Sequence, residues 1–153
     1  MEDQNGQRRD LAAMLQPVMR ALIAAELPVL DRHEISMWGY VILNALDGSP
    51  AGTQAELAHA IGADKTRIIA NLDELQEAGL ISREPDPADR RARLLSITTA
   101  GRRVRRAVRA EIQANEDRVL ARFPVRDRQA FLRVAATLAA LPLEEFTDTS
   151  RGR

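Results

Sequence analysis

The chain of 153 residues contains no cysteine and only two histidines, His33 and His59. The absence of cysteine excludes disulfide bonds, thiolate catalysis and thiol-based redox sensing. The two histidines stand at no metal-ligand spacing to one another or to a nearby pair of carboxylates. We therefore expect both to be ordinary core or helix-surface residues, and we predict no metal site and no cofactor.

We also identify no long apolar run in the sequence. We find none that approaches the roughly 20 residues needed to span a bilayer, and the polar N-terminus has no signal-like apolar segment. With 45% apolar residues the chain is long enough to bury one core. These features predict a single-domain, soluble, cytoplasmic protein with no membrane partner.

Basic and acidic residues balance at 22 each, but they are distributed unevenly. Between Arg83 and Arg109 nine arginines stand against three acidic residues, so this segment carries +6 and the remainder of the chain −6. A local basic field on an acidic body is a candidate site for a polyanion. A solvated helix face is the alternative, because several of these arginines recur at helical spacing.

Apolar residues recur at helical spacing near both ends of the chain. They predict a helix over 10–27, kinked at Pro17, a long helix from near Thr99 and a last helix over about 126–141. These helices are too apolar for their lengths unless something covers them, so we expect them to pair with a second copy in a symmetric dimer. The predicted dimer residues are Leu11, Leu15, Leu22, Phe131, Leu132 and Leu138.

Three capping signals divide the middle of the chain into helices. Ser36 precedes the apolar run MWGYVILNAL, which predicts a buried helix. Thr53 and Glu56 form a capping box at the start of a second helix, which ends at Gly62. Asp64 caps a third helix, whose predicted buried face consists of Ile68, Leu72 and Leu75. Two short helices joined by a glycine-containing turn predict a helix-turn-helix, although a helical hairpin inside a core is the alternative.

A β-hairpin follows this motif. Residues 80–84 and 93–99 are predicted strands, separated by the eight residues 85–92 that contain two prolines. When a helix-turn-helix binds a DNA duplex, a hairpin in this position acts as a wing that places its loop beside that duplex, where an arginine can enter a narrow minor groove. Asp89 is close enough to Arg91 to brace the loop by a charge-assisted hydrogen bond. A disordered charged loop without a partner is the alternative.

In a helix-turn-helix the second helix lies in a major groove and its N-terminal residues meet the bases. Lys65, Thr66 and Arg67 can bond to bases or phosphates, and Ile69 can pack on a thymine methyl group. Acidic residues further along the helix would repel phosphate and confine contact to its first two turns. The predicted DNA-contacting residues are Thr53, Asp64, Lys65, Thr66, Arg67, Ile69, Ala70, Arg83, Asp89, Arg90, Arg91 and Arg93.

Residues 53–101 resemble the winged helix-turn-helix of the MarR family of bacterial transcriptional regulators. The matching segments are the capping box with ELA, the LxxxGLIxR junction, the DPADRRAR wing and ITTAGR. With the flanking helices, the resemblance covers about residues 10–142. It implies an obligate dimer built from the first and the last two helices, and a recognition helix that begins at Asp64. It also implies that Asp89-x-Arg91 matches the family's Asp-x-Arg wing pattern, with Arg91 in the minor groove.

Ile69, Ala70 and Glu74 depart from that family, which often has polar or basic residues at these positions. The departures leave the operator sequence open and would weaken phosphate contacts. Many relatives bind a small aromatic or anionic effector between the dimer helices and the DNA-binding lobe. The candidates here are Met14, Val18, Arg20, Met37, Trp38 and Tyr40, for which core packing is the alternative.

The sequence thus predicts a mainly α fold with a small β-hairpin. It would form one domain of residues 1–153, with a winged lobe at about 35–100 and dimerisation helices at about 10–30 and 101–142. The predicted function is a homodimeric repressor that binds a pseudo-palindromic operator in double-stranded DNA and is released by a small effector. A winged-helix module that binds protein instead of DNA is a second hypothesis. A small enzyme is a third, but the sequence offers no nucleophile–base constellation for it.

Overall fold

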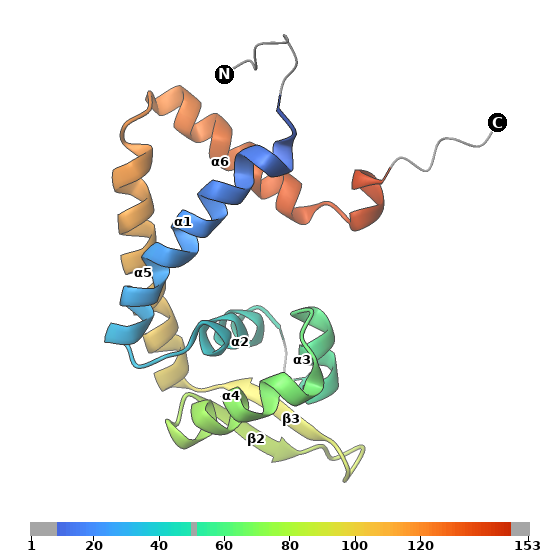
Figure 1. The fold of residues 1–153 in the computed structure, drawn as a ribbon. Coiled ribbons are helices and arrows are strands. Elements are labelled where there is room, and N and C mark those ends of the chain that lie inside the picture. The colour runs from blue at the N-terminus through green and yellow to red at the C-terminus, as the bar shows by residue number, and fades with distance from the viewer. Residues whose placement is uncertain (1–8, 50–51, 148–153) are drawn as a thin grey trace, which may run out of the picture. The chain divides into compact units, whose positions relative to one another are not determined.

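The computed structural model describes residues 9–49 and 52–147, apart from the side chain of Lys65. It forms two compact units, one extending to Ala114 and one beginning at Asn115. The elements are α1 (Leu11–Arg32), α2 (Met37–Asp47), β1 (Gly52–Thr53), α3 (Gln54–Ala60), α4 (Lys65–Glu77), β2 (Ile81–Pro85), β3 (Arg93–Ile97), α5 (Thr99–Leu120), α6 (Val125–Ala140) and the 3-10 helix η1 (Leu143–Phe146) (Figure 1). This order confirms the predicted fold class.

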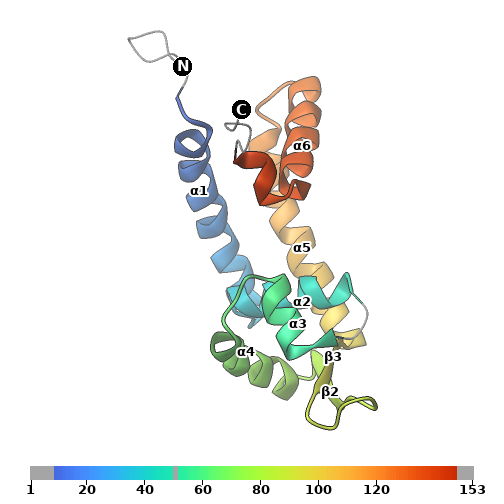
Figure 2. The ribbon, with the colours of Figure 1, turned by 90° about the vertical axis from the view of Figure 1, so that its right-hand side faces the viewer.

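The core of the first unit lies where α2, α4 and the small sheet meet, and Figures 1 and 2 show these elements gathered in one lobe. The predicted buried face of α4 is confirmed, because Ile68 and Leu72 are fully buried and Leu75 nearly so. From α2, Ile42 and Leu43 are also fully buried. Burying each such side chain contributes about 1.5–3 kcal/mol to folding, so this contact fixes α4 in the lobe.

Helix starts in the lobe follow the predicted caps. The Ser36 hydroxyl accepts a hydrogen bond from the Gly39 N–H at 2.9 Å at the start of α2. The capping box of α3 is complete, because the Glu56 N–H donates to Thr53 Oγ1 at 3.2 Å and the Thr53 N–H donates to Glu56 Oε2 at 2.6 Å. The bond that the Thr53 N–H donates to the carboxylate, followed by the interaction with the Thr53 side chain, lowers the pKa of Glu56. Gly62, with a φ of 64°, takes the left-handed conformation that ends the α3 turn.

The sheet has three antiparallel strands in the order β1-β3-β2. The predicted hairpin is confirmed as β2 and β3, with Ile81 opposite Ile97. β3 ends at Ile97 instead of residue 99, because Thr98 turns into α5 and its Oγ1 accepts from the Gly101 N–H at 3.0 Å. Sequence reasoning missed β1, where Gly52 pairs with Leu95. A strand of two residues is too short to show the alternation that marks a strand.

Helix α1 continues five residues beyond its predicted end and contains both Pro17 and Pro28. A proline inside a helix removes one backbone hydrogen bond and favours a helix end. Here the turn after Pro28 carries Val29 and Leu30, the two buried residues of α1. Their burial in the core offsets the loss, so the helix runs on to Arg32.

The longer helix also corrects our expectation about apolar length. By length and composition α1 could cross a membrane, because an 18-residue window of it has a mean hydropathy of 1.4. A single helix of this kind is weak evidence for a membrane segment, since helices of soluble cores meet the same criterion. Only 11% of that window is buried in the single chain, so the helix has a large apolar surface to cover.

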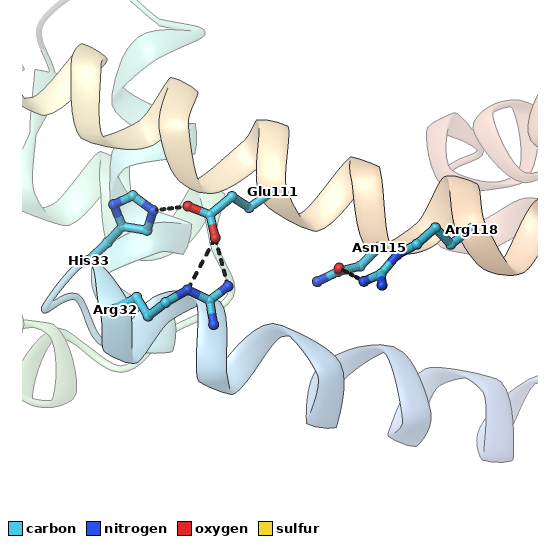
Figure 3. A network of polar contacts seen from close by, with 5 residues as sticks. All are labelled: Arg32, His33, Glu111, Asn115 and Arg118. Carbon is cyan, nitrogen blue, oxygen red and sulfur yellow. Dashed lines mark hydrogen bonds and ion pairs between the residues drawn. The ribbon is translucent and has the colours of Figure 1, made fainter.

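A small polar network ties the end of α1 to α5 (Figure 3). Arg32 Nη2 lies 2.6 Å from Glu111 Oε2, and His33 Nε2 lies 2.7 Å from Glu111 Oε1. The Arg32 guanidinium, and next His33, hold the pKa of Glu111 below its ordinary value of 4.5. Figure 3 also shows a separate hydrogen bond from Arg118 to Asn115 within the second unit. His33 thus pairs with a carboxylate at the surface of the fold.

Replacing Glu111 by glutamine should reduce stability in a pH-dependent way. Because folding lowers the pKa of this carboxyl, its contribution is complete above about pH 4.5 and is lost as the pH falls through the lower folded value. The difference in melting temperature between wild type and E111Q should therefore be largest near pH 7 and shrink towards pH 3. The control Glu77→Gln removes the same charge from an exposed carboxylate of α4 outside this network. A constant difference for E111Q would contradict the role of the network.

Candidate nucleic-acid interface

The first turn of α4 is organised by Asp64. Its Oδ1 accepts from both the N–H and the hydroxyl of Thr66, each at 2.8 Å. The bond from the Thr66 N–H, followed by that from its hydroxyl, lowers the pKa of Asp64. Asp64 is thus a helix cap that orients Thr66. Of the predicted contact residues, these two act together at the start of the helix.

The exposed face of α4 divides into two halves. Thr66, Arg67, Ile69 and Ala70 are exposed in the first two turns, and Ile69 retains 43% of its surface. Lys65 begins the helix, but its side chain lies outside the described residues. The second half exposes the acidic residues Asp73, Glu74 and Glu77. A basic and apolar half of the exposed face is thus followed by an acidic half, and the confinement of DNA contact to the first turns stays a prediction.

The loop between β2 and β3 projects from the lobe (Figures 1 and 2). Its ends are joined by the Asp86 N–H, which donates to the Ala92 carbonyl at 3.1 Å. Within it, the Asp86 carboxylate accepts from the Ala88 N–H at 2.8 Å. Arg90 and Arg91 in the loop, and Arg93 at the start of β3, are all exposed. The wing therefore has an ordered backbone that carries three solvent-facing arginines.

Asp89 braces this loop, but through the backbone and not through a guanidinium as predicted. Its Oδ1 accepts from the Arg91 N–H at 2.9 Å, and its carbonyl accepts from the Ala92 N–H at 3.0 Å. An aspartate readily bonds the backbone two residues ahead, and this arrangement competes with the longer reach to a side chain. Asp89 therefore does not hold the Arg91 guanidinium, and the Arg91 side chain is exposed to solvent.

Arg83 occupies a different place from the other predicted contacts. Its side chain is only 18% exposed, and its Nη2 lies 2.7 Å from Oδ1 of Asp73 on α4. The charges are close, but Nε and Nη2 have no aligned hydrogen-bond acceptor among the described residues. Arg83 therefore joins the base of the wing to α4 and does not present its guanidinium to solvent.

The basic turns at the start of α5 are partly structural. Asp47 at the end of α2 lies 3.2 Å from Arg102 Nε and 2.8 Å from Arg105 Nη1. Arg105 Nε also donates to Asn44 Oδ1 at 2.8 Å. The partners are more than fifty residues apart in the chain, so no local signal announces them. The remaining exposed arginines of this stretch are Arg103, Arg106 and Arg109.

The candidate effector residues lie on two helices of the first unit. Met14, Val18 and Arg20 are exposed on α1. On α2, Met37 and Tyr40 are half-buried against the core, and Trp38 is half-buried. A hollow of about 520 Å³ in the second unit involves other residues, namely Asp117, Arg118, Ala121, Val125, Arg128, Gln129 and Leu132. The effector site stays a prediction.

The predicted dimer residues are uncovered in the single chain. On α1, Leu11 and Leu15 are exposed and Leu22 is half-buried. On α6 about half of the surface of Phe131 and Leu132 is exposed, and Leu138 is half-buried. No residue of α6 is buried. Each helix thus presents an apolar surface of the kind that marks a protein interface.

A family model described as the MarR family matches residues 39–92. The transcriptional repressor CouR bound to a 23-mer DNA duplex is 27% identical, with a TM-score of 0.71 over 85% of this chain and 92% of that chain. CouR from Rhodococcus jostii RHA1 bound to p-coumaroyl-CoA is 26% identical, with a TM-score of 0.68 over 87% and 94%. A MarR-family transcriptional regulator from Rhodococcus sp. RHA1 is 25% identical, with a TM-score of 0.71 over 87% and 97%.

The match with the family model and the match with the solved structures agree. The model match spans α2, the helix-turn-helix and the loop of the wing. The structural matches extend over the flanking helices, since each covers at least 85% of this chain. The chain is therefore similar to the MarR family of winged-helix transcription regulators, through the family model over residues 39–92 and through solved structures over most of its length.

Proposed function

We propose that the protein is a cytoplasmic, homodimeric transcription regulator that binds double-stranded DNA and has no enzymatic activity. The observation that carries this proposal is the pairing of two exposed surfaces in one lobe. The first half of α4 presents Thr66, Arg67, Ile69 and Ala70, and the braced wing presents Arg90, Arg91 and Arg93. Both surfaces combine cations with groups that can read base edges.

In the proposed complex, α4 enters a major groove. Arg67 donates to a guanine edge or a phosphate, and Ile69 contacts a thymine methyl group. The wing lies over the adjacent minor groove, where Arg91 is attracted by the negative potential of a narrow A·T-rich segment. Asp64 and Arg83 contribute indirectly, because the one caps α4 and the other pairs with Asp73 on that helix.

The exposed apolar residues of α1 and of α6 support the dimer. We propose that both helices pack on a second copy, as their exposed leucines and Phe131 require cover. A two-fold dimer presents two recognition helices, so the operator is pseudo-palindromic, with half-sites about 10 base pairs apart. The length and apolar character of α1 are then explained by an interface between copies.

The proposal that the protein represses transcription and is released by an effector is supported by similar proteins of known structure. The transcriptional repressor CouR has been solved bound to a DNA duplex, and CouR from Rhodococcus jostii RHA1 bound to p-coumaroyl-CoA, which is both aromatic and anionic. We propose that this protein is likewise a repressor that an effector releases from DNA. The effector would be a small aromatic or anionic molecule that binds near Trp38 and Tyr40 of α2 and contacts Arg20 of α1. Bound effector would change the spacing of the two recognition helices and weaken operator binding.

A protein-interaction module without DNA binding is the competing function. Such a module has no need of exposed wing arginines, and this wing keeps three of them, two on its ordered loop and one at the start of β3. The exposed arginines of the wing therefore favour DNA over a protein as the binding partner.

Salt dependence tests the proposed function directly. The operator is first selected from random duplex DNA with the purified protein. Eight arginines in the dimer, Arg67, Arg90, Arg91 and Arg93 of each copy, would release phosphate counterions. Operator affinity should therefore fall by about a thousandfold or more between 50 and 200 mM salt. If selection enriches no sequence, or if the affinity barely changes with salt, the proposal is wrong.

A further inference from the structure

Asn71 lies on α4, two residues beyond Ile69, and its side chain is half-buried. Asparagine on a recognition helix is a side chain that can pair with adenine through both ends of its amide. Here both ends already have partners within the lobe. Asn71 Oδ1 accepts from the Ser36 hydroxyl at 2.9 Å, and Asn71 Nδ2 donates to the Arg67 carbonyl at 3.1 Å.

The exposed Ser36 hydroxyl both accepts and donates a hydrogen bond in this arrangement. It accepts from the Gly39 N–H as the cap of α2 and donates its proton to Asn71. One hydroxyl therefore joins the first turn of α2 to the middle of α4. The apolar contact between these helices is non-directional, whereas a hydrogen bond requires a particular separation and angle. The Ser36–Asn71 bond can therefore select one register of α4 against α2.

The backbone next to Ser36 is held in place by the core and by hydrogen bonds. The neighbouring Ile35 is buried, and the Ile35 N–H donates to the Leu30 carbonyl at 3.1 Å. Just before them, Arg32 and His33 hold Glu111 of α5. On the side of α4, the Asn71 amide is hydrogen-bonded to the carbonyl of Arg67, one turn earlier in the helix. Polar contacts thus join α5 to the end of α1, and separate hydrogen bonds join Ser36 in the following junction to the turn of α4 that carries Arg67.

We propose that Asn71 is a positioning residue for DNA recognition, which uses its bond to Ser36 to set the register of α4 and the aim of Arg67, and that it does not read a base. This inference rests on the proposed DNA-binding function.

The experiment compares four variants of the full-length protein on the selected operator. Asn71→Ala removes the amide, and Ser36→Gly removes the hydroxyl while leaving a residue that still suits a helix cap. The double variant completes a mutant cycle, and Ser36→Thr keeps a hydroxyl for both roles. Each is measured for operator affinity, for affinity to random duplex, for binding to operators with single base-pair changes, and for melting temperature.

If the inference is right, N71A and S36G each weaken operator binding by about five-fold for each copy of the dimer, the equivalent of one net hydrogen bond per copy. Affinity for random duplex stays constant, and discrimination falls at several base pairs together. The double variant binds no more weakly than either single variant, because both remove the same bond. S36T behaves as wild type, and all four melt cooperatively.

Two outcomes would overturn it. Loss of discrimination at one base pair in N71A, with S36G unaffected, would make Asn71 a base reader. Unchanged operator binding in both single variants would deny the bond a positioning role. Failure of the wild-type protein to bind DNA is a separate result, because it removes the proposed function and this inference together.

Discussion

Replacing Gly101 by alanine is expected to destabilise the first unit by about 3 kcal/mol or more, at the upper end of the cost of overpacking. A Cβ atom at this position would lie 2.1 Å from the Leu80 carbonyl oxygen and 2.8 Å from Ile97 Cγ1. The first of these atoms belongs to the backbone, so a change of side-chain rotamer cannot relieve the clash. Relief therefore requires α5 to move away from the segment that joins α4 to β2.

That movement is opposed by several hydrogen bonds around the same point. The Leu80 carbonyl accepts from the Thr98 N–H at 3.0 Å, and Thr98 Oγ1 donates to the Gly79 carbonyl at 2.7 Å. Thr98 Oγ1 also accepts from the Gly101 N–H. Shifting α5 would break this set and disturb β3 as well. The small residue is needed because the backbone approaches closely, and Gly101 is itself buried.

Gly48 provides the matched control. A Cβ there would meet its nearest atom at 3.8 Å, and its φ of −87° suits any L-residue. Gly48→Ala should leave the free energy of unfolding unchanged or raise it by about 0.4–1 kcal/mol, through a less flexible unfolded chain. Chemical denaturation of both variants measures the difference. A G101A protein as stable as G48A would show that the α5 contact is not tight in solution.

Replacing Arg91 by alanine should have the largest effect on DNA binding. The side chain is exposed on the wing, while its own N–H is held by Asp89. The folded protein should therefore lose little stability. Operator affinity should fall about thirtyfold or more, because both copies lose a groove contact worth at least about 1 kcal/mol. Fluorescence anisotropy with labelled operator at fixed salt gives the ratio.

Arg109→Ala is the control for charge alone. Arg109 is exposed on α5, and its removal changes the net charge of the protein by the same amount. We expect it to weaken operator binding no more than about twofold, as long-range screening leaves only a small effect. Equal losses for R91A and R109A would indicate a general charge effect without a wing contact. Unchanged binding by R91A would exclude the wing from the proposed mechanism.

Local signals in the sequence were sufficient for most of the fold. Ser36, Thr53 and Asp64 begin helices where predicted, because a capping side chain bonds backbone only two or three residues away. The buried face of α4 follows from the periodicity of its apolar residues. These interactions depend on near neighbours, so composition and spacing reveal them.

The candidate site was predictable in outline for the same reason. The exposed positions of α4 and the arginines of the wing follow from the order of elements and the local pattern. Asp89 shows where this reasoning fell short. The sequence predicted a brace between charged side chains, and the structure has the carboxylate on the Arg91 N–H. Two partners of similar proximity compete here, and backbone geometry decides between them.

Sequence by itself determined the starts of α2, α3 and α4, the hairpin, the apolar faces and the place of the exposed arginines, all of which depend on short-range chemistry. Only the tertiary structure decided which polar groups remain free for a ligand. Arg83 is engaged with Asp73, Arg105 with Asp47, and Asn71 with Ser36. Each pair forms between different elements once the core has packed. No periodicity or local spacing encodes such a meeting, because the apolar contacts of the fold bring the partners together.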